Sequence, residues 1–249
     1  MHRMHHLGLK AVLAALLYLW LATSTEAALL RPNDSREYPD ISAFANGYQS
    51  YTYDPSTKTG LFKLANIPFL LTNGQTPAGQ YLQSDVTSTA DHLRSQTITA
   101  VLDASGNLVA SSENSVRIYG TVVVGDQTYT GLLLSGTPTA FGSQTLKTVG
   151  VGNEDLFDLS LKITGGSLRS LYGPDAYIRV TTEANSTFKG VFTSDFSSEK
   201  VLTNTHTITN LVPSPVPEPT TLVVLLACGA GLLYRGRRRI AAADLAVRS

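Results

Sequence analysis

The sequence predicts an all-β domain, either an antiparallel β-sandwich or a jelly roll, between two apolar terminal segments. Three observations predict this fold. Ser and Thr supply 46 of the 189 residues in 28–216, and Thr favours strands whereas Ser favours turns. Apolar and polar residues alternate with period two, while helical periodicity is nearly absent. Turn residues recur at short spacing, so we expect about nine to eleven strands.

The first segment, residues 1–27, has the pattern of a secretory signal peptide. The first ten residues are basic because they include Arg3 and Lys10. Residues 11–22 are apolar, and small residues precede Ala28. We therefore expect cleavage after Ala27. An uncleaved anchor is the alternative, although this apolar run is short for a membrane span.

Alternating stretches separated by turn residues predict a series of hairpins along 28–212. The clearest one turns at Gly125-Asp126, a pair that suits a two-residue turn. Residues 85–94 are the best candidate for a short helix, and residues 67–72 are expected to add one more strand. The expected strand pairs, in order, are 47–54 with 58–64, 97–103 with 108–112, 115–124 with 127–134, and 176–183 with 187–193.

One further strand, 156–164, alternates most regularly. Phe157, Leu159, Leu161 and Ile163 fall on one face, and Asp158 falls on the other. This pattern predicts a strand with one face in the core and one face in water.

Tyrosines cluster in the first predicted strand. By alternation Tyr51 and Tyr53 share one face and Tyr48 lies on the other. Exposed rings can stack on sugars, so Tyr51 and Tyr53 are candidate glycan contacts. Packing in the core is the alternative explanation.

Residues suited to catalysis are few in 28–212. Only His92 and His206 can act as an imidazole base, and His206 lies in a polar stretch that we expect to be exposed. Glu154 and Asp155 follow Gly-Asn and are read as turn residues in water. We therefore expect no enzymatic activity, with a secreted hydrolase as the remote alternative.

Neither a metal nor a cofactor is expected. Asp103 to Asn107 resembles the start of a calcium loop but lacks the later acidic ligand, and a hairpin turn uses the same residue types. The single cysteine, Cys228, lies outside the predicted domain, so the domain contains no disulfide and no thiolate nucleophile.

The formal net charge of zero conceals an acidic domain. Between residues 28 and 216 there are 16 acidic and 12 basic residues. A weakly acidic surface without a basic stripe disfavours nucleic acid as a partner.

The C-terminal segment has three parts in order. Residues 213–219 form a proline-rich linker that ends in Pro217, Glu218 and Pro219. Residues 220–234 carry no charge and are expected to form a single transmembrane helix, although at roughly 22 Å it is shorter than the about 30 Å of a hydrocarbon core. The remaining residues, 235–249, begin with a basic cluster. Its members are Arg235, Arg237, Arg238 and Arg239.

These three parts resemble a PEP-CTERM sorting signal, which exosortase enzymes process in Gram-negative bacteria. An ordinary single-span anchor is the alternative. The arginines place the C-terminus in the cytoplasm and the domain outside. The resemblance covers 216–239 and does not extend to the domain.

The resemblance implies an exported protein that is held in the inner membrane before processing and then reaches the cell surface or the extracellular matrix. An exosortase-type enzyme is the implied partner, and exopolysaccharide is the implied associate. The sequence leaves a carbohydrate-binding module open as the alternative function.

Overall fold

The computed structural model describes residues 28–31, 37–147, 153–182 and 186–207. Within these ranges the chain forms ten strands and one short helix, α2 (Arg169–Tyr172). The strands are β1 (Asp40–Asp54), β2 (Thr59–Gln75), β3 (Tyr81–Asp85), β4 (Ser95–Asp103), β5 (Ser115–Val124), β6 (Gln127–Lys147), β7 (Asn153–Gly165), β8 (Asp175–Thr182), β9 (Phe196–Glu199) and β10 (Val201–Thr207). The expectation of an all-β, antiparallel domain is confirmed.

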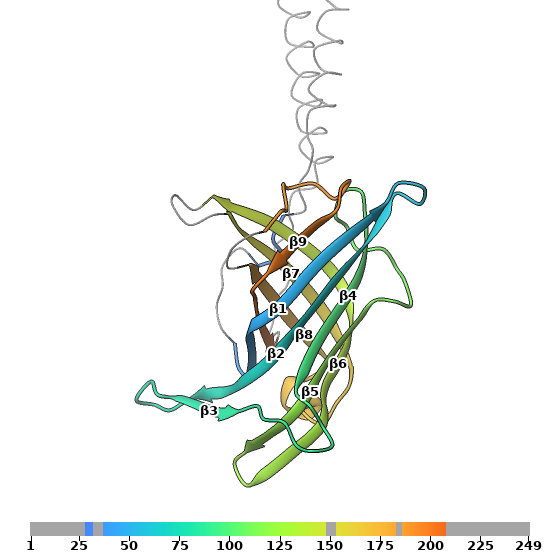
Figure 1. Ribbon diagram of the computed structural model, residues 1–249. Helices are drawn as coiled ribbons and strands as arrows, with labels where there is room; N and C mark the ends of the chain where they lie inside the picture. The colour runs from blue at the N-terminus through green and yellow to red at the C-terminus, as the bar shows by residue number, and fades with distance from the viewer. Residues whose placement is uncertain (1–27, 32–36, 148–152, 183–185, 208–249) are drawn as a thin grey trace, which may run out of the picture. The chain divides into compact units, whose positions relative to one another are not determined.

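All strands belong to one antiparallel sheet that closes on itself (Figure 1). The order β2-β4-β5-β6-β7-β8-β10-β1 returns to β2, because β1 pairs with β2 along almost its whole length. Eight strands therefore form a barrel, which leaves no open edge around the wall. The sandwich or jelly-roll arrangement is not confirmed, since the strands do not separate into two sheets.

The two remaining strands extend the wall at its ends. β9 pairs with β1 beyond the start of β10, and β3 pairs with β2 beyond the start of β4. Lys200 has a positive φ between β9 and β10, so the two strands follow one another along the same edge of β1 with a local change of direction.

Alternation places the core inside the barrel. Val116, Ile118 and Val122 of β5 are buried, as are the β4 and β6 partners of Val116 and Ile118. The predicted core face of β7 is confirmed, because Phe157, Leu159, Leu161 and Ile163 are all buried. The predicted turn at Gly125 is also confirmed, with a positive φ of 60°.

Aromatic side chains fill one end of the barrel. Phe188, Phe192 and Phe196 come from the segment that crosses the upper end in Figure 1. They pack on Tyr51 and Phe157, with ring centroids 4.8–5.9 Å apart. The lower end in Figure 1 carries α2, from which Leu168 just before the helix and Tyr172 within it are buried. These apolar groups stabilise the barrel by removing both ends of its core from water.

Three predicted elements are wrong. Residues 85–94 are not helical, because Val86 is buried and Thr87 pairs with Thr121 of β5, which keeps the chain extended. Residues 108–112 form only a bridge from Leu108 to Leu102, since β4 takes β5 as its partner. Residues 187–193 form no strand because Phe188 and Phe192 cover the barrel end instead.

Candidate functional site

All of the sorting residues predicted from the sequence lie outside the described residues. This applies to the predicted signal peptide and Ala27, to the linker with Pro217, Glu218 and Pro219, to the apolar segment, and to the basic cluster. In the part of the chain that the structure does describe, no helix has the length and apolar character needed to cross a membrane.

Tyr51 is not a surface residue, so its prediction as a glycan contact is wrong. Its side chain is 1% exposed, its hydroxyl donates to the carbonyl oxygen of Phe192 at 2.9 Å, and its ring stacks on Phe196. Tyr53, on the same inward face, is half-buried and packs against the core. Tyr48 points the other way and is 52% exposed. The predicted alternation of the three tyrosines is correct, but Tyr48 is the ring that faces solvent.

His206 is buried, not exposed as expected. Its Nδ1 lies 3.3 Å from Oδ1 of Asp40, and both side chains are almost completely inaccessible. The His206 ring also stacks on Tyr177, with centroids 6.3 Å apart. A histidine beside a carboxylate is a possible arrangement for a general base, but no substrate reaches this one from the surface. His92, by contrast, is exposed.

Asp155 lies inside the barrel and is also not the exposed turn residue that the sequence suggested. Its carboxyl group is buried, and its backbone N–H donates to the hydroxyl of Thr182 at 2.8 Å. Burial raises the pKa of Asp155, and the hydroxyl groups of Ser186 and Thr145 near the carboxylate partly oppose the increase. Glu154 has no described side chain.

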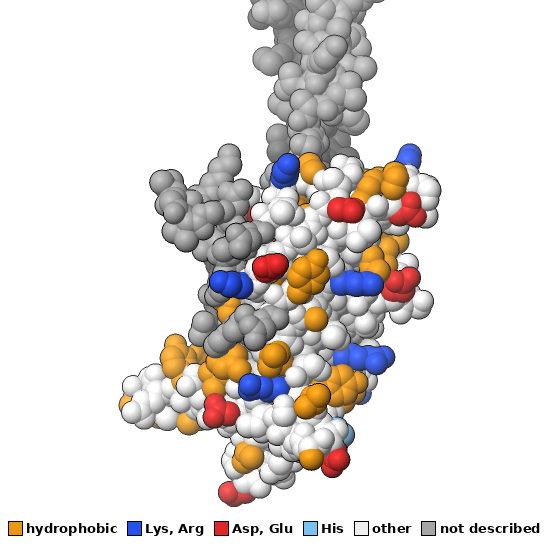
Figure 2. Space-filling model, viewed as in Figure 1, with side chains coloured by type: hydrophobic (Ala, Val, Ile, Leu, Met, Phe, Trp, Pro, Cys, Tyr) orange, Lys and Arg blue, Asp and Glu red, His pale blue; other side chains and the backbone are white. Residues whose placement is uncertain are grey.

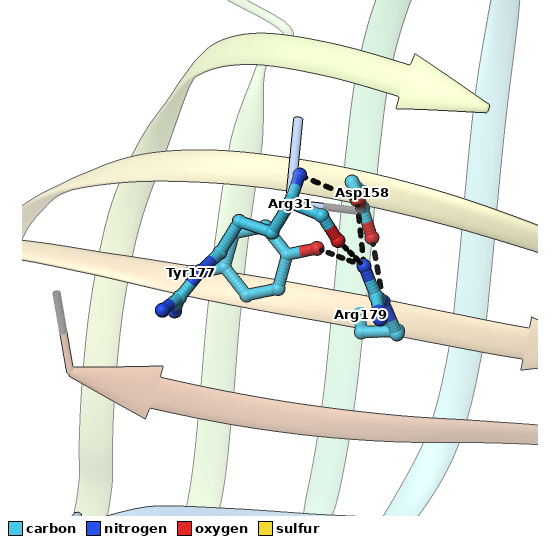
Figure 3. A network of polar contacts seen from close by, with 4 residues as sticks. All are labelled: Arg31, Asp158, Tyr177 and Arg179. Atoms are coloured by element: carbon cyan, nitrogen blue, oxygen red, sulfur yellow. Dashed lines mark hydrogen bonds and ion pairs between the residues drawn. The ribbon is translucent and has the colours of Figure 1, made fainter. Parts of the chain in front are cut away.

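Asp158 forms the densest polar network of the described residues (Figure 3). Its carboxylate accepts hydrogen bonds from Nε and an amino group of Arg179, at 3.0 and 3.1 Å. It also accepts the backbone N–H of Arg31 at 3.2 Å. The Asp158 side chain is completely buried, and the Arg179 side chain is 9% exposed. The prediction that Asp158 faces water is therefore wrong, although it does lie on the outer face of β7.

The segment 28–31 explains this burial, because it lies across the outer face of the barrel. Arg179 donates to the carbonyl oxygen of Arg31, so both backbone groups of Arg31 are bonded to the Asp158–Arg179 pair. The Arg31 guanidinium lies over the ring of Tyr177, 5.0 Å from its centroid, and pairs with Glu37. We call Arg31, Asp158, Tyr177 and Arg179 the strap network. It holds residues 28–31 against the barrel wall.

The close approach of this segment requires glycine at position 142. A Cβ on Gly142 of β6 would collide with the carbonyl oxygen of Ala28 and lie 3.0 Å from the backbone N of Leu30. Gly142 of β6 and Asp158 of the adjacent strand β7 therefore both position residues 28–31.

Residues Asp103 to Asn107 form a turn. The Asp103 carboxylate accepts the backbone N–H groups of Ser105 and Asn107, at 2.8 and 2.9 Å, which is the geometry of an Asx turn. No group of three or more His, Cys, Asp or Glu side chains that could hold a metal occurs among the described residues.

A surface hollow of about 410 Å³ lies over the outer faces of β5, β6 and the end of β7. Its polar lining residues are Ser115, Arg117, Tyr119, Ser135, Thr137 and Thr164. We call this the polar hollow. The strand register shifts between Ile118 and Tyr119 and again between Ser135 and Gly136, at its margins. Such bulges bend the wall locally. Sequence reasoning missed the hollow, since it needs the pairing of three strands.

Comparisons with known proteins identify no relative: no family model, no curated protein and no solved structure matches this chain.

Proposed function

We propose that this chain is an exported, non-enzymatic protein of the bacterial cell surface or extracellular matrix. A PEP-CTERM tail sorts it, an exosortase-type enzyme processes that tail, and the exported barrel associates with exopolysaccharide. The observation that carries the proposal is the order of Pro-Glu-Pro, an uncharged segment and four arginines in residues 217–239.

The physical properties of the tail support transient residence in the membrane. An uncharged segment of 15 residues is about five residues shorter than a full span requires. Arginines directly after it give the positive-inside orientation, with the barrel outside the cell membrane. Proline at 217 and 219 keeps the approach extended, the form in which a processing enzyme accepts a substrate.

The structure of the barrel supports a function of its outer wall rather than of its interior. Its two ends are covered by apolar side chains, and its core contains a cluster of packed rings. In Figure 2 the side of the barrel that bears β1, β2 and β4 is mostly white, with separate charged and hydrophobic side chains. Hydroxyl-rich walls of this kind suit contact with a hydrated polymer.

Cell fractionation tests the proposal. Replacing Pro217, Glu218 and Pro219 by alanine should leave the full-length chain in the inner membrane, whereas the wild-type chain leaves it. Replacing Pro213 and Pro215 in the same linker is the matched control and should not retain the protein. If the triple variant leaves the inner membrane as the wild type does, the tail is not the sorting signal.

A carbohydrate-binding module is the second candidate, and the polar hollow favours it. A concave surface that combines hydroxyl groups, an arginine and an aromatic ring has the chemistry that sugar recognition needs. Glycan-array binding by residues 28–216 is the direct test, and the absence of binding would exclude this function. A hydrolase has weaker support, because the only His–carboxylate pair of the described residues, His206 with Asp40, is buried.

A further inference from the structure

The side chain of Arg117 is the central feature of the polar hollow. It is exposed on β5, and in the described part of the chain it makes neither an ion pair nor a hydrogen bond. The other arginines of the barrel wall differ: Arg179 is paired with Asp158, and Arg94 donates to the carbonyl oxygen of Val86 at 2.8 Å. Arg117 thus presents an uncommitted guanidinium beside Tyr119.

The strand register places Arg117 in a continuous row of outward residues. Tyr48 is opposite Ala65, Ala65 is opposite Thr97, and Thr97 is opposite Arg117. Ser135 follows on β6. Since neighbouring strands are about 4.8 Å apart, the row from Tyr48 to Arg117 extends about 14 Å. An aromatic ring therefore marks one end of the row and a cation lies near the other.

A second row runs beside the first one. Ser50, Lys63, Thr99 and Ser115 are successive partners across β1, β2, β4 and β5. Lys63 is exposed and, like Arg117, has no ion-pair partner among the described residues. Apart from Glu199 of β9, which lies opposite Tyr48 at the far end of the first row, the two rows contain two cations, several hydroxyl groups and no carboxylate. On a domain with more acidic than basic residues, this is a locally positive and hydroxyl-rich surface.

From this arrangement we propose that the polar hollow and the two rows bind an acidic polysaccharide, with Arg117 pairing with a carboxylate of a uronic-acid unit. The planar guanidinium forms two parallel hydrogen bonds with a carboxylate. The ring of Tyr48 or Tyr119 stacks on the apolar face of a sugar, and Ser115, Ser135 and Thr137 bond to its hydroxyl groups. This inference rests on the proposed function, since it names the kind of exopolysaccharide and the surface that contacts it.

Titration calorimetry on the full-length chain in detergent tests the proposal. The probes are an oligogalacturonate and a neutral malto-oligosaccharide of equal length. The acidic probe should bind and weaken as salt is added, because exposed charges are screened. The neutral probe should bind at least tenfold more weakly, as expected for loss of a charge-assisted hydrogen bond.

Variants locate the site. Arg117→Ala should weaken binding of the oligogalacturonate at least tenfold, and Arg117→Lys should recover only part of it because the bidentate geometry is lost. Lys189→Ala removes an exposed cation outside the hollow and should leave affinity unchanged. Unchanged thermal unfolding confirms that each variant is folded.

Three results with the saccharide probes overturn the inference: equal affinity for both probes, full affinity in Arg117→Ala, or no binding of the acidic probe by the folded wild-type chain. A fourth result also overturns it: the wild-type chain binds anionic phospholipid vesicles through Arg117 and does not bind the acidic probe. None of these results alters the fractionation of the Pro217–Glu218–Pro219 variant, so failure of this inference is distinguishable from failure of the proposed function.

Discussion

The strap network gives the sharpest prediction on stability. In the single variant Asp158→Leu, the guanidinium of Arg179 stays buried without its carboxylate, and the N–H of Arg31 loses its acceptor. Breaking a buried ion pair by removing one partner costs about 3–5 kcal/mol. For a domain of this size the melting temperature should fall by roughly 6–20 °C.

The double variant Asp158→Leu/Arg179→Met separates pairing from burial. Replacing both charges by apolar residues of similar volume is often neutral or stabilising. The double variant should therefore be far more stable than the sum of the two single changes predicts, with a coupling energy of several kcal/mol. Chemical unfolding of all four proteins measures this energy.

A matched control lies on the same two strands. Lys162 and Asp175 are 3.7 Å apart but are 61% and 49% exposed. Exposed pairs contribute about 0–1 kcal/mol, so Lys162→Met should change stability by less than about 1 kcal/mol. If Asp158→Leu costs no more than Lys162→Met, the strap network does not stabilise the barrel. Hydrogen exchange gives a second measurement, since the Arg31 amide should exchange faster in Asp158→Leu.

Three further predictions concern other buried positions. The amide of Gln96 is buried without a hydrogen-bond partner among the described residues, so Gln96→Met should raise the free energy of unfolding by about 1–2 kcal/mol; a loss of stability on chemical unfolding would contradict this. Because the native pKa of Asp155 is raised from 3.8, the unfolded chain releases this proton first and native stability falls as pH rises above that value. Asp155→Asn lacks this penalty, so its stability relative to the wild type should increase with pH from about 4, whereas a pH-independent difference would refute the assignment. Gly142→Ala should release the segment that contains Ala28 and increase its proteolysis, while Gln144→Ala, which is exposed on the same strand, should not.

Local patterns predicted the strands well because alternation depends on neighbouring residues. The hairpin at Gly125 and the core face of β7 with Phe157 follow from period two and turn chemistry alone. Closure of the barrel did not follow from them. It depends on β1, near the start of the domain, which pairs with β2 on one side and with β10, near the end of the domain, on the other. A sandwich has the same local alternation, so alternation does not distinguish the two folds.

The site residues show the same limit. Alternation correctly places Asp158 on the outer face of its strand, opposite to core residues such as Leu159. It does not reveal that Arg31 covers Asp158 or that Asp40 lies beside His206. These two contacts, Arg31 with Asp158 and Asp40 with His206, join positions more than 120 apart in the chain. Likewise, Arg117 belongs to a row of exposed side chains only once the register of four strands is known.

Mass spectrometry of the protein released from its native cells tests the central claim, export with processing at both ends. The account predicts a chain that begins at Ala28 and ends near Pro219, without the four arginines of 235–239. Recovery of an intact chain of 249 residues from the inner membrane, with no shorter form outside it, would contradict the account.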